Sequence, residues 1–249
     1  MKKLFSIALA SALLALGSAN AAPITFTGTS GNLAASASFD VVGSDLVVTL
    51  SNIGGDALVP ADLLTAVFFT LAGNPTLGSG SAILNTGSTV LFDPQGQPAG
   101  GVVGGEWAYL NGISGPNGAN KGISSSGFGL FGGATFPGPD LDPPSAVAGF
   151  NYALLPAADN PATGNNQLTG NVPLVKSSVV FRLTGIDAAF DPSAPGAITN
   201  VSFQYGTSLS EPNVKADTPP PPTGNVPEPG MLALLGIGLA GLGVVRRRR

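Results

Sequence analysis

The sequence predicts an all-β protein: an antiparallel β-sandwich ectodomain, flanked by an N-terminal signal helix and a single C-terminal transmembrane helix. The composition is rich in turn formers, with 36 Gly and 22 Pro among 249 residues, and these two residues are the poorest helix formers. Several short segments alternate apolar and polar side chains, which is typical of half-buried strands. Hydrophobic residues reach 43% and charged residues only 10%, so the chain has the means to build a core.

The clearest strand pattern lies near the start of the predicted domain. Apolar side chains alternate with polar ones over residues 35–41, and the alternation resumes over 46–51 after the pair Gly43-Ser44. Two alternating runs joined by a Gly-Ser pair predict a β-hairpin with a II′-type turn.

Other segments carry weaker versions of the same pattern. Further strands are predicted at 66–71, 82–92, 106–110, 179–184 and 201–205. One short helix is expected at 60–65, where Asp62 falls in the first turn. Many short strands with one apolar face each favour a two-sheet sandwich, and the lack of a fixed repeat disfavours a β-solenoid.

Composition also restricts the chemistry. The chain has no Cys and no His, which removes disulfides, thiol nucleophiles, the usual zinc ligands and the commonest general base. We therefore expect no cofactor, no metal and no enzymatic activity. Between the two ends, four basic residues stand against fourteen acidic ones, a net charge of −10 that repels nucleic acid.

The N-terminus has the three parts of a secretory signal. Lys2 and Lys3 give the positive start, residues 4–16 are apolar, and Ala19-Asn20-Ala21 forms an A-x-A cleavage site. An N-terminal membrane helix is the alternative, but the apolar run is short for a full span. The sequence predicts cleavage after Ala21.

The C-terminus also has three parts in a fixed order. These are the motif Val226, Pro227, Glu228 and Pro229, the uncharged segment 230–245, and the cluster Arg246, Arg247, Arg248 and Arg249. The uncharged segment would span about 24 Å as a helix, close to the thickness of a bilayer core. The arginines are expected to stay cytoplasmic as a membrane stop, which leaves residues 22–228 outside.

This tail resembles the PEP-CTERM sorting signal, a tail that also carries the label ice-binding protein C-terminal domain. The resemblance implies an exosortase, an integral-membrane protease or transpeptidase, as partner, with processing at or near Pro227–Pro229. It also implies an inner-membrane-anchored precursor and later delivery to the cell surface or an extracellular polymer. Segments 105–110 and 203–212 are similar to a group of exosortase-dependent surface proteins of unknown activity.

The chain therefore divides into four predicted parts. They are a signal peptide (1–21), a β-sandwich ectodomain (22–212), a Pro-rich linker (213–225) and the sorting signal (226–249). Four consecutive prolines, 219–222, favour a semi-rigid polyproline II spacer that holds the domain off the membrane.

Two pairs of residues within the ectodomain leave two interpretations each. Trp107 and Tyr109 share one face of a strand, so they either stack on sugar rings or belong to the core, and the core is favoured. Asp140 and Asp142 either hold Ca²⁺ or lie in a solvated turn, and the turn is favoured because further oxygen ligands are missing.

Three other patterns are weaker. The run Gly127 to Gly132 matches G-x-G-x-x-G, but its neighbours predict a glycine-rich loop rather than a dinucleotide site. Glu106 and Asp93 would suit a glycosidase acid–base pair, although nothing fixes their spacing. Lys176 and Ser177 are adjacent on a strand and should point to opposite faces, which argues against a Ser–Lys pair.

Three functions follow from these patterns. The first is a non-enzymatic surface or matrix protein, and the second is a glycan- or surface-binding module with extracellular polysaccharide as its partner. The third is a secreted carboxylate-dependent hydrolase. Ice binding lacks the regular array of Thr-x-Thr positions that a flat ice-matching face would need.

Overall fold

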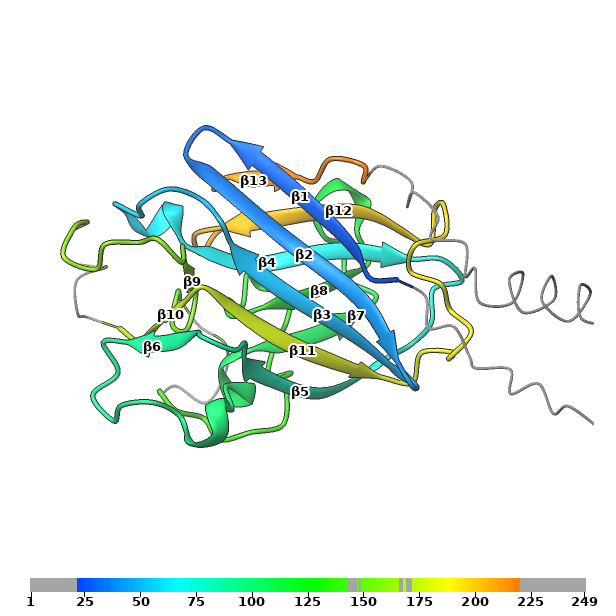
Figure 1. Ribbon diagram of the computed structural model, residues 1–249, viewed down its shortest axis with the longest axis horizontal. Coiled ribbons are helices and arrows are strands. Elements are labelled where there is room, and N and C mark those ends of the chain that lie inside the picture. The colour runs from blue at the N-terminus through cyan, green and yellow to red at the C-terminus, as the bar shows by residue number, and fades with distance from the viewer. Residues whose placement is uncertain (1–21, 143–146, 148, 166–167, 169–171, 220–249) are drawn as a thin grey trace, which may run out of the picture. The chain divides into compact units, whose positions relative to one another are not determined.

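The computed structural model describes residues 22–142, 147, 149–165, 168 and 172–219, which form two β-sheets packed face to face (Figure 1). The predicted signal helix and the predicted transmembrane helix both lie outside the described residues. Among the residues that are described, no helix has the length and hydropathy needed to cross a membrane.

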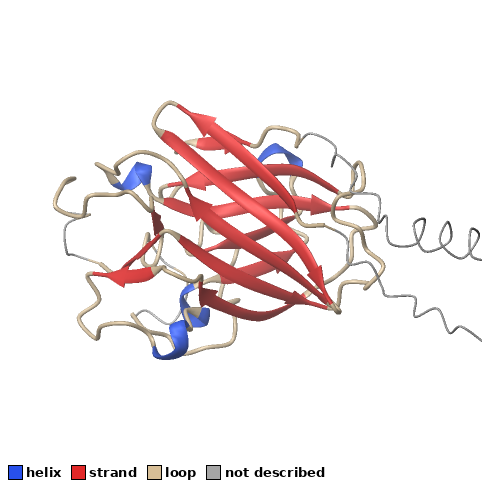
Figure 2. Cartoon of the chain, in the orientation of Figure 1, coloured by secondary structure: helices blue, strands red, loops and turns tan. Residues whose placement is uncertain are grey.

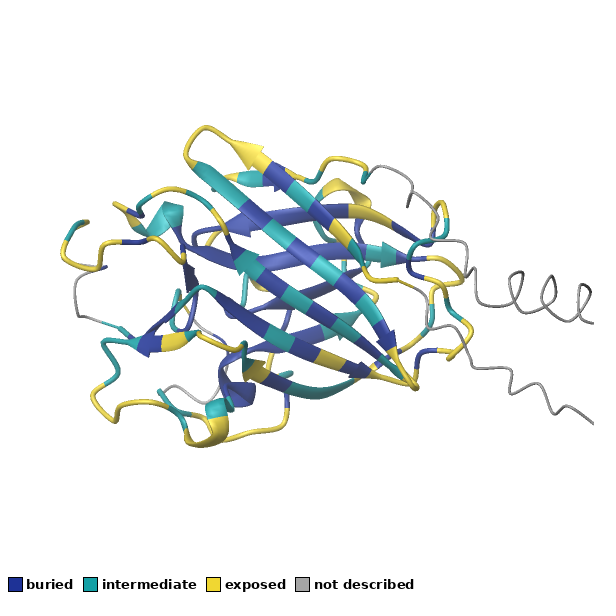
Figure 3. Ribbon diagram, viewed as in Figure 1, coloured by how far each residue is buried: buried dark blue, intermediate teal, exposed yellow. Residues whose placement is uncertain are grey.

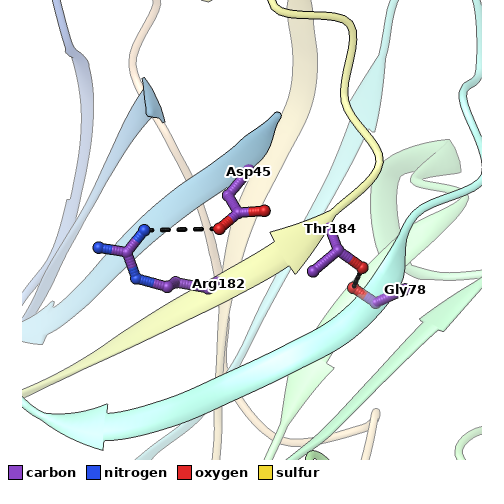
Figure 4. Close-up of polar contacts among 4 residues, drawn as sticks. All are labelled: Asp45, Gly78, Arg182 and Thr184. Carbon is purple, nitrogen blue, oxygen red and sulfur yellow. Dashed lines mark hydrogen bonds and ion pairs between the residues drawn. The ribbon is translucent and has the colours of Figure 1, made fainter. Parts of the chain in front are cut away.

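The first sheet has five strands, all antiparallel. In spatial order they are β1 (Ile24–Ser30), β2 (Leu33–Val42), β3 (Asp45–Asn52), β11 (Ser178–Thr184) and β5 (Gly78–Leu84). Side chains on its outer surface also link neighbours: Arg182 Nη1 lies 3.6 Å from Asp45 Oδ2, and Thr184 Oγ1 donates to the Gly78 carbonyl at 3.4 Å (Figure 4).

The second sheet has eight strands. They are β4 (Leu64–Leu71), β6 (Thr89–Leu91), β7 (Ala108–Asn111), β8 (Lys121–Ser124), β9 (Leu154–Leu155), β10 (Leu174–Lys176), β12 (Ile198–Tyr205) and β13 (Asn213–Lys215). The predicted antiparallel fold is confirmed except at one place, because β9 and β10 pair in parallel. The helical elements described are short 3₁₀ turns, Pro60–Asp62, Ala99–Gly101, Gly104–Glu106 and Pro116–Gly118 (Figure 2).

The predicted hairpin over residues 35–51 is confirmed as β2 and β3. Gly43 has a positive φ of 65° and Ser44 does not, as a II′ turn requires. The predicted apolar residues of both strands are buried, and Phe39 lies opposite Val48 in the register.

The predicted helix at 60–65 is wrong beyond its first turn. Only Pro60–Asp62 is helical, and the Asp62 carboxylate accepts hydrogen bonds from the N–H groups of Leu58 and Val59. Strand β4 then begins at Leu64, because residues 65–70 are mostly β-branched or aromatic and pair on both sides.

Two predicted strands also need correction. The segment 82–92 is broken by a turn in which the Ser88 N–H donates to the Asn85 carbonyl, so that β5 and β6 belong to different sheets. The segment 106–110 begins as the 3₁₀ turn Gly104–Glu106, and its strand starts only at Ala108.

The predicted boundary between domain and linker at residue 212 is too early. Strand β13 lies within the expected linker and buries Val214 against the domain. After it, the Ala216 N–H donates to the Val201 carbonyl and the Asp217 N–H to the Thr27 carbonyl, at 2.9 and 2.8 Å. The start of the expected linker therefore joins an edge of each sheet and belongs to the folded domain.

The core lies between the sheets. Aromatic rings from the two sheets meet across it. The ring centroids of Phe39 (on β2) and Phe69 (on β4) are 5.2 Å apart, and those of Phe181 (on β11) and Trp107 (next to β7) are 5.0 Å apart. A further apolar cluster covers the outer face of the second sheet, formed by Ala66, Phe68, Ala108, Ala119, Phe131 and Val147. Strands β2 and β3 of the first sheet instead alternate buried and half-exposed side chains along their length, and the half-exposed ones form its outer face (Figure 3).

Candidate functional site

The predicted sorting residues, the membrane-stop arginines and the signal cleavage site lie outside the described residues. This set comprises Val226, Pro227, Glu228, Pro229, Arg246, Arg247, Arg248, Arg249, Ala19 and Ala21. Their roles stay predictions from the sequence.

The aromatic pair Trp107 and Tyr109 belongs to the core. Their exposed fractions are 0% and 3%, and the Tyr109 hydroxyl donates to Asn111 Oδ1 at 2.6 Å. The core interpretation is confirmed, and the sugar-stacking interpretation of these two residues is wrong.

The glycine motif forms turns. The N–H groups of Leu130 and Phe131 both donate to the Gly127 carbonyl, and Gly129 and Gly132 have positive φ. The described residues on either side do not form the strand-to-helix junction that a dinucleotide site requires, so the predicted loop is confirmed.

Four carboxyl groups gather beside the buried Tyr152. The Tyr152 hydroxyl donates to Asp93 Oδ2 at 2.7 Å, and Asn151 Nδ2 donates to Asp142 Oδ2 at 2.5 Å. The charges of Glu106 and Asp142 also act on Tyr152, and those of Asp93 and Asp140 on Asp142. The structure thus brings Glu106 and Asp93 into one cluster together with Asp140 and Asp142, which the sequence did not indicate.

Burial controls the electrostatics of this carboxylate cluster. The pKa of Glu106 is raised to about 7 as the net of these effects: burial raises it most, two backbone hydrogen bonds lower it, and the nearby Asp140 raises it. The pKa of Asp142 is raised by burial and then by the charges of Asp93 and Asp140. Burial also raises the pKa of Tyr152, as does its hydrogen bond to Asp93.

The position of Glu106 does not favour catalysis. A pKa near 7 suits a general acid, but a general acid must reach its substrate. Glu106 is 5% exposed, and its Oε1 accepts hydrogen bonds from the N–H groups of Leu141 and Asp142 at 2.5 and 2.9 Å. The carboxyl group therefore stabilises the loop that contains Leu141 and Asp142.

The described residues contain no group of three or more Asp or Glu side chains placed to hold a metal ion. Asp140 is exposed and Asp142 is half-buried, with its carboxylate bonded to Asn151. The segment at residues 140–142 is thus a loop rather than the predicted turn, and of its two carboxylates only that of Asp140 is exposed to solvent.

Lys176 and Ser177 are not brought together as a catalytic pair. Lys176 Nζ donates to the Asp159 carbonyl at 2.8 Å. Ser177 has a φ of 91° and lies between β10 and β11, where the chain passes from one sheet to the other.

An apolar pocket of about 300 Å³ lies where the chain leaves the domain. It is lined mainly by Ile24, Phe26, Pro192, Pro195, Ile198 and Pro219. The first and last parts of the described chain thus meet at one end of the sandwich, and no motif in the sequence indicated this.

A buried lysine was also missed. Lys121 opens β8, is 1% exposed, and donates from Nζ to Asn74 Oδ1 at 2.9 Å and to Asn111 Oδ1 at 3.3 Å. No sequence signal marks it, because its partners come from two other segments, the turn after β4 and the end of β7.

Comparison with known proteins finds one match. Residues 225–249 match the model of the PEP-CTERM protein-sorting motif. No curated protein and no solved structure matches the chain. The predicted resemblance of the tail is confirmed, and the motif supports export and exosortase-dependent sorting to the surface.

Proposed function

We propose that this PEP-CTERM protein is a non-enzymatic surface or extracellular-matrix protein. The sorting motif at residues 225–249 carries the proposal, because it stands only a few residues after a β domain whose last described backbone bond is made by Asp217. In this proposal the folded domain is the part that is displayed at the surface, and the tail is the signal that directs it there.

The precursor is anchored by residues 230–245 as a membrane helix, with Arg246 to Arg249 held in the cytoplasm. Pro227 and Pro229 keep the backbone around Glu228 extended, so that an enzyme can grip it without first unfolding a helix. Exosortase then processes the chain at or near this motif.

A role without catalysis is supported by how the ectodomain uses its carboxyl groups. Glu106 holds a loop through two backbone N–H groups, and Asp93 accepts the hydrogen bond of Tyr152. The chain also has no Cys and no His, so it lacks thiol nucleophiles and the commonest general base.

A glycan- or surface-binding module is the second candidate. At the end of the sandwich opposite the apolar pocket, four apolar side chains are between 39% and 51% exposed: Ile53, Leu58, Val59 and Leu209. Their two loops are joined there by the Gly206 N–H, which donates to the Leu63 carbonyl. Such an outward-facing end suits contact with a polymer or another surface.

Localisation in intact cells tests the proposal. With an exosortase present, the protein should reach the surface or the extracellular polymer, and without one it should stay in the inner membrane. Deleting residues 230–249 should release the protein from the envelope. Surface display that is equal in both strains would contradict exosortase-dependent sorting.

A further inference from the structure

The surroundings of Lys121 are unusual for a lysine. Its side chain is almost fully buried, a place where lysine is seldom found without an opposite charge. The ion pair found in the part of the chain that the structure describes is Arg182 with Asp45 on the other sheet. The acceptors of Lys121 Nζ are instead the side-chain amides of Asn74 and Asn111.

This setting favours an uncharged amine at Lys121. Burial lowers the pKa of the ammonium group because the charged form loses its hydration. The neutral amine is the nucleophilic form of lysine, and its fraction at neutral pH rises as the pKa falls.

The amide of Asn74 is placed to react with this amine. Its Oδ1 accepts from Lys121 Nζ at 2.9 Å and from Asn120 Nδ2 at 3.1 Å. The first bond brings the amine to the amide, and the bond from Asn120 stabilises the negative charge that develops on the oxygen during attack. The carbonyl carbon lies one C=O bond, about 1.2 Å, from that oxygen, so Nζ is within about 4 Å of it. Asn74 is exposed in the turn after β4, which lets a leaving group escape to solvent.

Asn111 is held more tightly. Its Nδ2 donates to the Leu77 carbonyl at 2.8 Å, and its Oδ1 accepts from the Tyr109 hydroxyl at 2.6 Å. Because both ends of this amide are bonded, we assign Asn111 the role of orienting Lys121 rather than reacting with it.

We propose that Lys121 and Asn74 condense to an intramolecular amide bond. Nζ attacks Cγ of Asn74, the C–N bond of the side-chain amide breaks, and a proton from Nζ leaves with the amide nitrogen as ammonia. Nothing is oxidised or reduced and no co-reactant is needed, since the fixed geometry supplies the effective concentration. The bond would join β8 to the turn after β4 in a protein that has no cysteine to cross-link.

Mass spectrometry of the protein purified from cells tests the bond directly. The denatured chain is digested with a protease that cuts after Glu, which separates the Asn74 and Lys121 peptides at Glu106. We expect these two peptides to remain joined, with a combined mass lower by one ammonia, about 17 Da, than the sum for the free peptides. Trypsin should also fail to cut after Lys121 while cutting after Lys176, the internal control.

Lys121→Arg provides the matched variant, because it keeps a long side chain with hydrogen-bond donors but loses the nucleophilic amine. The two peptides should then separate, and Asn74→Ala should have the same effect. Free peptides of unchanged mass from the unmodified protein would overturn the proposal. A bond from Lys121 to Asn111 would also overturn it, because it would reverse the roles of the two asparagines.

Discussion

The two sheets of the domain differ in what covers them. In the five-stranded sheet, β2 and β3 alternate buried and half-exposed side chains, so one face meets the core and the other meets water. In the eight-stranded sheet, β4 is buried on both faces over most of its length. Loops between β7 and β9 place Ala119, Phe131 and Val147 over its outer face.

This difference explains where sequence patterns are informative. A sheet that faces water on one side imposes strict alternation on its strands, whereas a sheet covered on both sides accepts apolar residues at every position. The second apolar layer is therefore invisible to a search for alternation. It should nevertheless contribute to stability like a core, and substitutions in both sheets test that expectation.

The largest expected effect comes from removing an aromatic ring from either layer. Phe181→Ala in the central core and Phe68→Ala in the outer layer should each cost about 3–5 kcal/mol of unfolding free energy, since both rings are fully buried. Val47→Ala on the water-facing side of the first sheet is the control and should cost about 1 kcal/mol or less. Urea unfolding measures all three, and a loss for Phe68→Ala as small as that of the control would show that the outer layer is not a core.

A smaller effect is expected at Gly122 in β8. An added Cβ would lie 2.9 Å from side-chain atoms of Ile113, Phe131 and Phe68, all three on the outer layer. Gly122→Ala should therefore cost about 1–3 kcal/mol through overpacking. Combining it with Phe68→Ala frees the space, so the double variant should lose less than the two single losses together. Simple additivity would contradict the predicted contact.

A pH effect is expected from Glu106. Its folded pKa of about 7 lies above the ordinary 4.5, so the stability that it contributes is full below pH 4.5 and is lost as pH rises through 7. The melting temperature should fall between pH 5 and pH 8, by roughly 2–4 °C for each kcal/mol lost. Glu106→Gln keeps an oxygen to accept both backbone N–H groups and should flatten this dependence. An unchanged pH profile would show that Glu106 is not its source.

The smallest effect belongs to the ion pair of Arg182 and Asp45 on the water-facing side. The arginine side chain is 45% exposed, and exposed pairs contribute about 0–1 kcal/mol. Arg182→Ala should leave the urea midpoint nearly unchanged at high salt. A loss comparable with that of Phe68→Ala would contradict the contrast between the two outer faces.

The sequence predicted the fold best in the five-stranded sheet. The hairpin over residues 35–51 and the strand at 179–184 follow from alternation, and their buried residues match. Strands β9 and β10 have two and three residues, too few to carry a period. The missed start of β4 and the missed strand β13 depend on partners far along the chain, which local patterns do not contain.

The candidate sites likewise differ in how far local sequence patterns predicted them. Burial of Trp107 and Tyr109 was favoured because large aromatic side chains usually belong to cores. The carboxylate cluster around Tyr152 and the asparagine side chains around Lys121 were not predicted, because the fold brings each set together from segments that are distant in the sequence. The tail was predicted best, since its function depends on the order of residues rather than on folding.

The intact mass of the surface-displayed protein tests exosortase-dependent sorting most directly. In cells that have an exosortase, we predict a chain that begins at Ala22 and lacks Met231 to Arg249, because processing falls at or near Pro227–Pro229. Cells without the enzyme should retain the arginine cluster on the protein in their inner membrane. Mature protein that still carries Arg246 to Arg249 in the presence of an exosortase would contradict sorting by cleavage.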